Sequence, residues 1–293
     1  MVENPRDLLS RYDLSPRRSL GQNFLVDPRA PRRIAAGADV GPEDIVLEVG
    51  AGVGTLTEAL AERAARVLAV ETDPALVEAL EDLYRERARV EVIPGDILEL
   101  DPAALLGVEP PEQRPLWGAR LEHYLVVANL PYYITAAVMR HLLEAAVRPA
   151  RMVVTVQKEV AQRIVAADGK MSLLAVGVHF YGKPRTLFRL KRGAFYPVPK
   201  VESAVLRLDL YEEPPVEVDD VATFFDVVRA GFAQRRKQLK NTLAATLHLD
   251  SNAVAEAMES HGVPPTRRAE TLSLEEWARV VRALEPLLPP SRR

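Results

Sequence analysis

A glycine-rich segment between an apolar run and a helical pattern most constrains what this chain can fold into. The run Ile45–Val49 leads into Gly50-Ala51-Gly52-Val53-Gly54, and helical spacing of apolar residues begins at Thr55. Glycines at such a turn let the backbone approach a ligand closely, and the start of a helix offers free N–H groups. By itself this pattern suits NAD, FAD or S-adenosylmethionine equally, or a tight turn that holds no ligand.

Strand-like and helical segments alternate on both sides of this turn, which predicts a mostly parallel sheet covered on both faces. Expected strands after Ile45–Val49 are Arg66–Val70, Arg89–Ile93, Tyr124–Ala128 and Arg151–Val156. Expected helices are Pro31–Ala38, Thr55–Ala65, Pro74–Glu86 (capped by Asp73) and Ile134–Val147. Lys183–Leu190 and Val201–Leu210 predict a final antiparallel hairpin at the sheet edge, and Pro102–Arg120 predicts a surface loop.

A second domain is expected because 293 residues exceed the usual size of one domain. An acidic, proline-containing linker at Tyr211–Asp219 marks the boundary, and the pattern beyond it is helical. We therefore predict a catalytic domain with an N-terminal arm over residues 1–212 and a helical domain over residues 218–293. The expected helices there are Asp220–Phe232, Lys237–Leu247, Asn252–His261 and Ser273–Leu284, the last with a capping box.

Composition indicates in which cellular compartment the protein works. The chain has no cysteine, which excludes disulfides and thiolate metal sites, and we expect no metal. No apolar run reaches the roughly 18 residues that a membrane span needs. The N-terminus is polar and arginine-rich without the apolar core of a secretory signal. These features favour the cytoplasm.

Two acids after the next strands narrow the choice of cofactor. Glu71 ends the second strand, where a carboxylate can accept hydrogen bonds from ribose hydroxyls. Asp96 follows the third strand and could accept from an adenine amino group. The position of the third glycine in a dinucleotide fingerprint holds Thr55. An adenosine ligand without a pyrophosphate, S-adenosyl-L-methionine, therefore fits better than NAD.

The tetrapeptide Asn129-Leu130-Pro131-Tyr132 follows the fourth strand, where ligands bind in open α/β sheets. An adenine amine is a poor nucleophile because its lone pair is delocalised into the ring. The Asn129 amide oxygen and the Leu130 carbonyl can accept the two N–H protons and localise that pair. Pro131 would hold the turn, and Tyr132 could stack on the base. In isolation the same four residues could form an ordinary turn.

Basic residues cluster in two acid-free stretches although the net charge is −3. Lys183–Lys200 contains Lys191 and Arg192, and Val227–Leu249 holds a second group. We expect this second group to contact phosphates from a helix; its members are Arg235, Arg236, Lys237 and Lys240. Each cluster alone could be a solvated surface. Together they favour a polyanionic partner.

These motifs resemble the rRNA adenine N6,N6-dimethyltransferases (the Dim-type family) along nearly the whole chain. The matching segments are Leu20–Leu25, Glu48–Gly54, Asn129–Tyr132, Gln157–Ala161, Phe195–Val205 and Phe232–Asn241. The resemblance implies a Rossmann-like class I methyltransferase with a seven-stranded sheet and a small all-helical C-terminal domain. It implies a cofactor site made of Asn23, Leu25, Gly50, Gly52, Glu71, Asp96 and Asn129. It also implies that Phe195 sandwiches the target adenine opposite Tyr132.

The resemblance further implies dimethylation of two adjacent adenosines near the 3′ end of small-subunit (16S) rRNA during ribosome assembly. The partners would be that RNA and the immature small subunit, with the enzyme a monomer. Two departures concern substrate docking: a longer connection at Gly107–Arg120, and Asp168 where the family has an aromatic residue.

Other functions stay open at this point. A methyltransferase of the same fold could act on large-subunit rRNA, as the Erm resistance family does, or on DNA adenine. The protein could serve mainly as a non-catalytic ribosome-assembly factor. An NAD(P)-dependent oxidoreductase is disfavoured because Thr55 breaks the glycine fingerprint and no Tyr-x-x-x-Lys or histidine arrangement is present.

Overall fold

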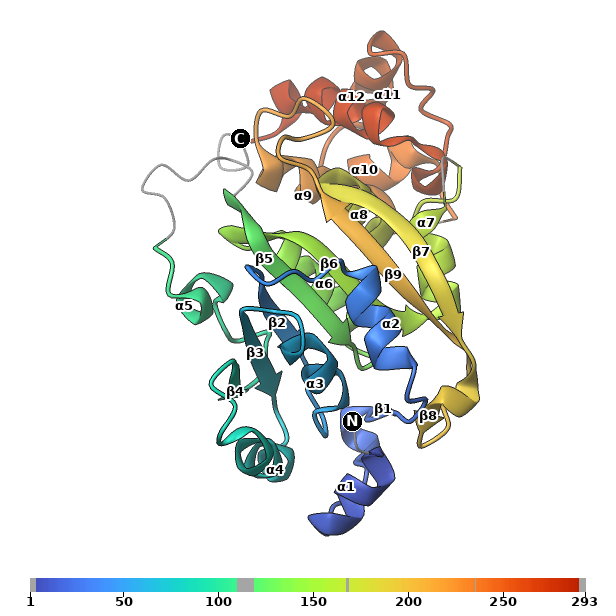
Figure 1. Cartoon of the computed structure of the whole chain (residues 1–293). Coiled ribbons are helices and arrows are strands. Elements are labelled where there is room, and N and C mark those ends of the chain that lie inside the picture. The colour runs from blue at the N-terminus through green and yellow to red at the C-terminus, as the bar shows by residue number, and fades with distance from the viewer. Residues whose placement is uncertain (1–3, 110–118, 167–168, 235, 290–293) are drawn as a thin grey trace. The chain divides into compact units, whose positions relative to one another are not determined.

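The structure, a computed structural model, describes residues 4–109, 119–166, 169–234 and 236–289 (Figure 1). The chain divides into two compact units. The first comprises Met1–Gln162 and Lys183–Leu210, and the second comprises Arg163–Gly182 and Tyr211–Arg293. The second unit thus includes the segment 163–182, which the predicted division at residues 212 and 218 places in the catalytic domain; that division stays a prediction.

A seven-stranded sheet has the order β4-β3-β2-β5-β6-β9-β7 (Figure 1). These strands are β4 (Val90–Pro94), β3 (Arg66–Glu71), β2 (Ile45–Val49), β5 (Ala119–Asn129), β6 (Val147–Gln157), β9 (Ser203–Leu210) and β7 (Gly182–Leu190). The pairs from β4 to β6 are parallel, whereas β9 runs antiparallel to β6. The predicted fold class is confirmed, and so is the placement of the last two strands at the edge.

The core of the first unit lies where two helices cover one face of this sheet. Ile34 of α2 (Ala30–Gly37) and Leu60 of α3 (Thr55–Ala61) are fully buried against Val46, Val127 and Val153 of the strands. Burying one such aliphatic side chain contributes roughly 1.5–3 kcal/mol. Consecutive residues of β2 and β3 are buried, as expected for central parallel strands whose two faces are both covered.

The other helices of this part of the chain are α1 (Pro5–Arg11), α4 (Pro74–Tyr84), α5 (Pro102–Leu106), α6 (Thr135–Leu143) and α7 (Lys158–Val165). Asp73 caps α4 as predicted, since its carboxylate accepts from the N–H of Ala75 at 3.2 Å. The prediction that α3 continues to Ala65 was wrong; it ends at Ala61. The surface loop predicted at 102–120 was wrong at its ends, which form α5 and the start of β5, and residues 110–118 lie outside the described residues.

A two-stranded ribbon joins the N-terminal arm to the segment before β9, and the sequence did not predict it. The strand β1 (Phe24–Leu25) pairs antiparallel with β8 (Phe195–Tyr196), and Leu25 lies opposite Phe195. Two residues per strand carry too little pattern to be recognised locally. This ribbon carries the arm to the carboxyl edge of the main sheet.

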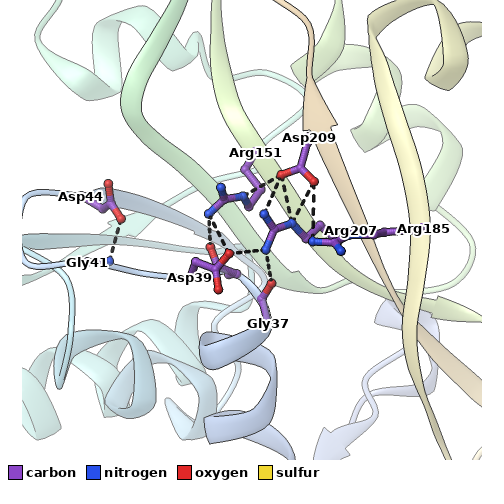
Figure 2. A network of polar contacts seen from close by, with 9 residues as sticks. Gly37, Asp39, Gly41, Asp44, Arg151, Arg185, Arg207 and Asp209 are labelled. Carbon is purple, nitrogen blue, oxygen red and sulfur yellow. Dashed lines mark hydrogen bonds and ion pairs between the residues drawn. The ribbon is translucent and has the colours of Figure 1, made fainter.

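A network of arginines and aspartates ties the loop after α2 to strands β6 and β9 (Figure 2). Arg207 of β9 donates to both carboxylate oxygens of Asp209, to the Gly37 carbonyl at 3.0 Å and to Asp39. Arg151 of β6 donates to Asp209 at 2.8 Å. The Arg207 guanidinium lowers the pKa of the Asp39 carboxyl. The network therefore holds segments together that lie far apart in the sequence.

The second unit is helical. Its helices are α8 (Leu173–Tyr181), α9 (Val221–Phe232), α10 (Leu239–Leu247), α11 (Ser251–Ser260) and α12 (Leu274–Leu284). Phe180 stacks on Phe224 with ring centroids 4.7 Å apart, and Trp277 is fully buried. The predicted capping box of α12 is confirmed between Ser273 and Glu276. The helix α8 was not predicted.

Candidate cofactor and substrate site

The glycine-rich turn after β2 follows a left-handed path that brings it against β3. Gly50 has φ +73° and Gly52 φ +61°, a region that side chains with a Cβ disfavour. The N–H groups of Gly50 and Ala51 both donate to the Val70 carbonyl, at 2.9 and 3.1 Å. A Cβ on Gly52 would lie 3.0 Å from the ring of Phe24. The turn therefore needs glycine for its conformation and for the close approach of the N-terminal arm.

Glu71 is held by the backbone at the end of β3. Its Oε2 accepts from Gly52 N–H at 2.8 Å, and its Oε1 accepts from Thr72 and Asp73 N–H, both at 2.9 Å. A carboxylate offers about four acceptor positions, so one position on Oε2 is left for a ligand hydroxyl. Burial raises the pKa of Glu71, and the three hydrogen bonds oppose that rise. The predicted contact with ribose is thus available at one oxygen.

These residues surround a cavity of about 220 Å³ at the carboxyl ends of β2, β3, β4 and β5. All the predicted cofactor residues line it: Asn23, Leu25, Gly50, Gly52, Glu71, Asp96 and Asn129. Asp96 is exposed, and its Oδ1 accepts from the N–H of Leu98 at 3.0 Å. The structure therefore brings together residues from the arm and from four strand ends, although their roles stay predictions.

Asn129 is oriented by the N-terminal arm. Its Nδ2 donates to the Asn23 carbonyl at 2.9 Å, and Asn23 Nδ2 donates to the Gly21 carbonyl at 2.8 Å. Because the amide nitrogen is engaged, the Oδ1 of Asn129 is the atom left to accept from a substrate amine. This orientation is the one that the proposed amine chemistry needs.

The turn after Asn129 is fixed at both ends. The Pro131 carbonyl accepts from Ile134 N–H and from Thr135 Oγ1, both at 3.3 Å. Tyr132 is partly buried, lines the cavity, and has its hydroxyl 2.7 Å from Ser203 Oγ. Burial raises the pKa of Tyr132, so the phenol stays neutral near pH 7. Leu130 and Pro131 also line the cavity.

Phe195 lies elsewhere. It is 1% exposed and belongs to the apolar core with Leu25, Ile34 and Leu190. It is not among the residues that line the cavity. The structure therefore does not place Phe195 in the cavity beside Tyr132, and its stacking on the target adenine stays a prediction. The cause is the β1–β8 pairing, which turns Phe195 into the core.

The two basic clusters lie in different units. Lys191 and Arg192 are exposed in the first unit. In the second, Arg236 and Lys237 are exposed, and Lys240 lies in the first turn of α10. The prediction that Arg236 and Lys237 lie on a helix was wrong, because α9 ends at Phe232 and α10 begins at Leu239. Arg235 lies outside the described residues.

Glu48, Thr55 and Tyr133 are among the cavity-lining residues that were not predicted as site residues. Glu48 is 1% exposed, its Oε2 accepts from Thr57 Oγ1 at 2.6 Å, and burial raises its pKa to about 8. The Thr55 hydroxyl is buried without a hydrogen-bond partner. Tyr133 is 64% exposed at the mouth. A single acid in the apolar run Ile45–Val49 was the available signal for Glu48; the others had none.

The charge of the cavity lining tests which cofactor fits. Among the described lining residues there are three acids, Glu48, Glu71 and Asp96, and neither lysine nor arginine. A dinucleotide pyrophosphate would meet acids without a basic partner, whereas a cationic sulfonium is favoured there. Glu71 and Asp96 offer hydrogen-bond acceptors for an adenosine, and the buried Thr55 hydroxyl is available for a hydrogen bond with a ligand. Fold and cavity together define a class I methyltransferase.

The comparisons identify the family. The family model described as "Ribosomal RNA adenine dimethylase" matches residues 14–285, so this chain belongs to that family. A "Ribosomal RNA small subunit methyltransferase A" of Moorella thermoacetica is 43% identical over 284 residues, covering 95% of this chain and 96% of that protein. One from Dehalococcoides mccartyi (strain CBDB1) is 41% identical over 280 residues, covering 96% and 92%. The predicted family, enzyme class and cofactor are confirmed.

Two solved structures share the fold. The 23S rRNA methyltransferase ErmE has a TM-score of 0.65 and 28% identity, covering 89% of this chain and 99% of its own. A dimethyladenosine transferase from Plasmodium falciparum has a TM-score of 0.72 and 21% identity, covering 90% and 98%. Within the described residues we find no helix that could span a membrane and no group of side chains that could hold a metal.

Proposed function

We propose that this protein uses S-adenosyl-L-methionine to dimethylate N6 of two adjacent adenosines near the 3′ end of small-subunit (16S) rRNA. The orientation of Asn129, with its amide oxygen free beside an acidic cavity, is the observation that carries the proposal. The relatives named as small-subunit methyltransferases support the choice of RNA.

The chemistry requires positioning more than a strong base. When bound, the cofactor supplies an electrophilic methyl group on a sulfonium. Asn129 Oδ1 and the Leu130 carbonyl would accept hydrogen bonds from the two N–H groups of the target amine, so that the amine's lone pair is directed at the methyl carbon. That lone pair would form the new N–C bond, and the electron pair of the broken S–C bond would leave with the demethylated cofactor. The methylated ammonium then loses a proton to water.

The RNA target can be tested by mass spectrometry of ribosomal RNA from cells with and without the gene. We expect N6,N6-dimethyladenosine at two adjacent small-subunit positions only when the gene is present. Modified adenines in large-subunit RNA would instead support the second candidate, an enzyme that acts there. The likeness to ErmE over most of both chains is the observation that favours that candidate.

The Asn129→Ala variant separates the enzyme from a non-catalytic assembly factor. We expect it to reduce methyl transfer at least ~100-fold, the size of losing an electrostatic donor or acceptor in a preorganised site. Binding to immature small subunits should persist, because Asn129 is only partly exposed and the phosphate contacts lie elsewhere. Methyl transfer at the wild-type rate would contradict the role given to Asn129.

The partners follow from the same proposal. Lys191, Arg192, Arg236, Lys237 and Lys240, together with Arg235, would contact phosphates of the immature small subunit without reading sequence. The helical domain over residues 218–293 would carry the second group. We place the protein in the cytoplasm, where such subunits are assembled, and propose that it acts as a monomer.

A further inference from the structure

Three large apolar side chains remain exposed in the described part of the chain. Tyr133 is 64% exposed, Val198 54% and Val201 43%. Single exposed apolar residues are common, but a group of them beside a binding site marks an interaction surface. All three lie in the first unit, on the loop after β5 and the loop before β9.

The two loops meet at the mouth of the cavity. Tyr132 in the first loop and Ser203 at the start of β9 are joined by the 2.7 Å contact between their hydroxyls. Tyr133 follows Tyr132 directly, and Val201 precedes Ser203 by two residues. Neighbouring Cα atoms are about 3.8 Å apart. The Cα atoms of Tyr133 and Val201 therefore lie within about 8 Å of those of Tyr132 and Ser203.

Tyr133 is held in place at this mouth rather than free in solvent. It lines the cavity, and a Cβ added to Gly21 would lie 3.0 Å from its Cδ1 atom. The ring thus rests against the backbone of the N-terminal arm. An aromatic ring that is supported on one side and open on the other can stack on a planar ligand with little loss of conformational entropy.

Three exposed cations flank Val198 and Val201 in the sequence. Lys200 lies in the same loop, whereas Lys191 and Arg192 lie just before β8. Arg192 Nε donates to the Pro199 carbonyl at 2.7 Å, which keeps the loop closed. The acid in this loop, Glu202, is paired with Lys158 at 2.7 Å, and this pairing lowers its pKa. Exposed apolar and cationic side chains therefore occur together in this segment, and Arg192 is held beside Pro199.

We infer that Tyr133, Val198 and Val201 form a platform on which nucleobases beside the target adenosine pack, while Lys191, Arg192 and Lys200 contact the flanking phosphates. Apolar faces for bases interleaved with cations for the backbone are what single-stranded nucleic acid requires. This platform rests on the proposed function, since its occupant is the RNA segment that presents the target. It adds residues that bind the neighbours of the reacting base.

Binding of the full chain to two RNA probes tests the platform. One probe is a ten-nucleotide oligoadenylate, and the other has the same backbone with abasic sites at all ten positions. We expect Tyr133→Ala to weaken binding of the intact probe ~5- to 150-fold, the loss of ~1–3 kcal/mol for one stacked base, and to leave the abasic probe unaffected. Tyr133→Phe keeps the ring and should bind like the wild type.

Lys200→Ala is the matched control for charge. It should weaken both probes equally and reduce the slope of log affinity against log salt by ~0.7, the value for one phosphate on a single strand. The platform is overturned if Tyr133→Ala binds the intact probe like the wild type, or weakens both probes alike. It is also overturned if the wild type does not prefer bases, as expected for a protein partner. None of these results depends on which ribosomal RNA is methylated.

Discussion

Glu48 shows at the scale of one residue how burial sets chemistry. The side chain is buried, so its charged form is disfavoured and its pKa rises to about 8, although the hydrogen bond that it accepts from Thr57 opposes this rise. Glu71 nearby adds to this rise, and Glu48 in turn helps to raise the pKa of Tyr84. The cavity therefore contains a carboxyl that is protonated at neutral pH when no ligand is bound.

This protonation predicts how stability depends on pH. The folded pKa of about 8 lies above the ordinary value of 4.5, so the unfolded chain releases this proton first as the pH rises. The contribution of Glu48 to the free energy of unfolding is then full below pH 4.5 and is lost progressively up to about pH 8. Over that window the loss is on the order of a few kcal/mol.

The variant Glu48→Gln should remove this dependence, because its amide can still accept from Thr57 but does not titrate. We expect its free energy of unfolding, relative to the wild type, to increase from pH 5 to pH 8.5 in urea titrations without ligand. Parallel curves for the two proteins over that range would show that Glu48 does not titrate as proposed.

Gly231 shows the same dependence on surroundings at the scale of an element. It lies in α9, and a Cβ there would overlap the indole of Trp277 in α12 and lie 3.0 Å from Leu239. Trp277 is fully buried, so its indole could move away only by displacing other core side chains. The close approach of these two helices therefore requires a glycine in the middle of a helix, where glycine is otherwise unfavourable.

Gly231→Ala should lower the free energy of unfolding by ~1–3 kcal/mol, since overpacking outweighs the helix propensity gained from alanine. Gly177→Ala in α8 is the matched control. Its nearest neighbour, Phe225, would be 3.9 Å from the new Cβ, an ordinary contact. We expect this variant to be neutral or more stable in thermal melts. Equal effects of the two substitutions would contradict the packing assigned to Trp277.

At the scale of the whole molecule, Arg207 connects segments that are about 170 residues apart in the chain. Its side chain is 9% exposed, and different N–H groups of its guanidinium pair with Asp39 and with Asp209. Leucine would leave Asp39 with the ion pair to Arg151, and Asp209 with its ion pairs to Arg151 and Arg185. Lysine could not reproduce the planar fork that bonds to both.

We expect Arg207→Leu to lower the free energy of unfolding by ~1–3 kcal/mol, less than for a fully buried pair because Asp39 and Asp209 are partly solvated. Arg207→Lys should recover little of that loss. Arg282→Leu, which breaks the exposed pair with Glu217, should cost under ~1 kcal/mol. Urea titrations of the three variants would measure this, and similar losses for Arg207 and Arg282 would contradict the network.

How far the sequence could predict the site depends on the range of the interactions involved. Glu71, Asp96 and Asn129 follow strand ends, and parallel strands bring their carboxyl ends to one edge, so their convergence was predictable. The boundary of α3 and the open turn at Arg236 and Lys237 were not, because helix ends depend on contacts outside the local pattern.

The sequence by itself determined the α/β fold class, the order of the acids along the sheet edge and the choice of an adenosine cofactor, because these depend on local periodicity and spacing. Only the tertiary structure decided that Asn23 orients Asn129, that Phe195 turns into the core, and that Glu48 is a buried acid. The physical reason is that burial, hydrogen-bond partners and pKa depend on segments distant in sequence, which no local pattern specifies.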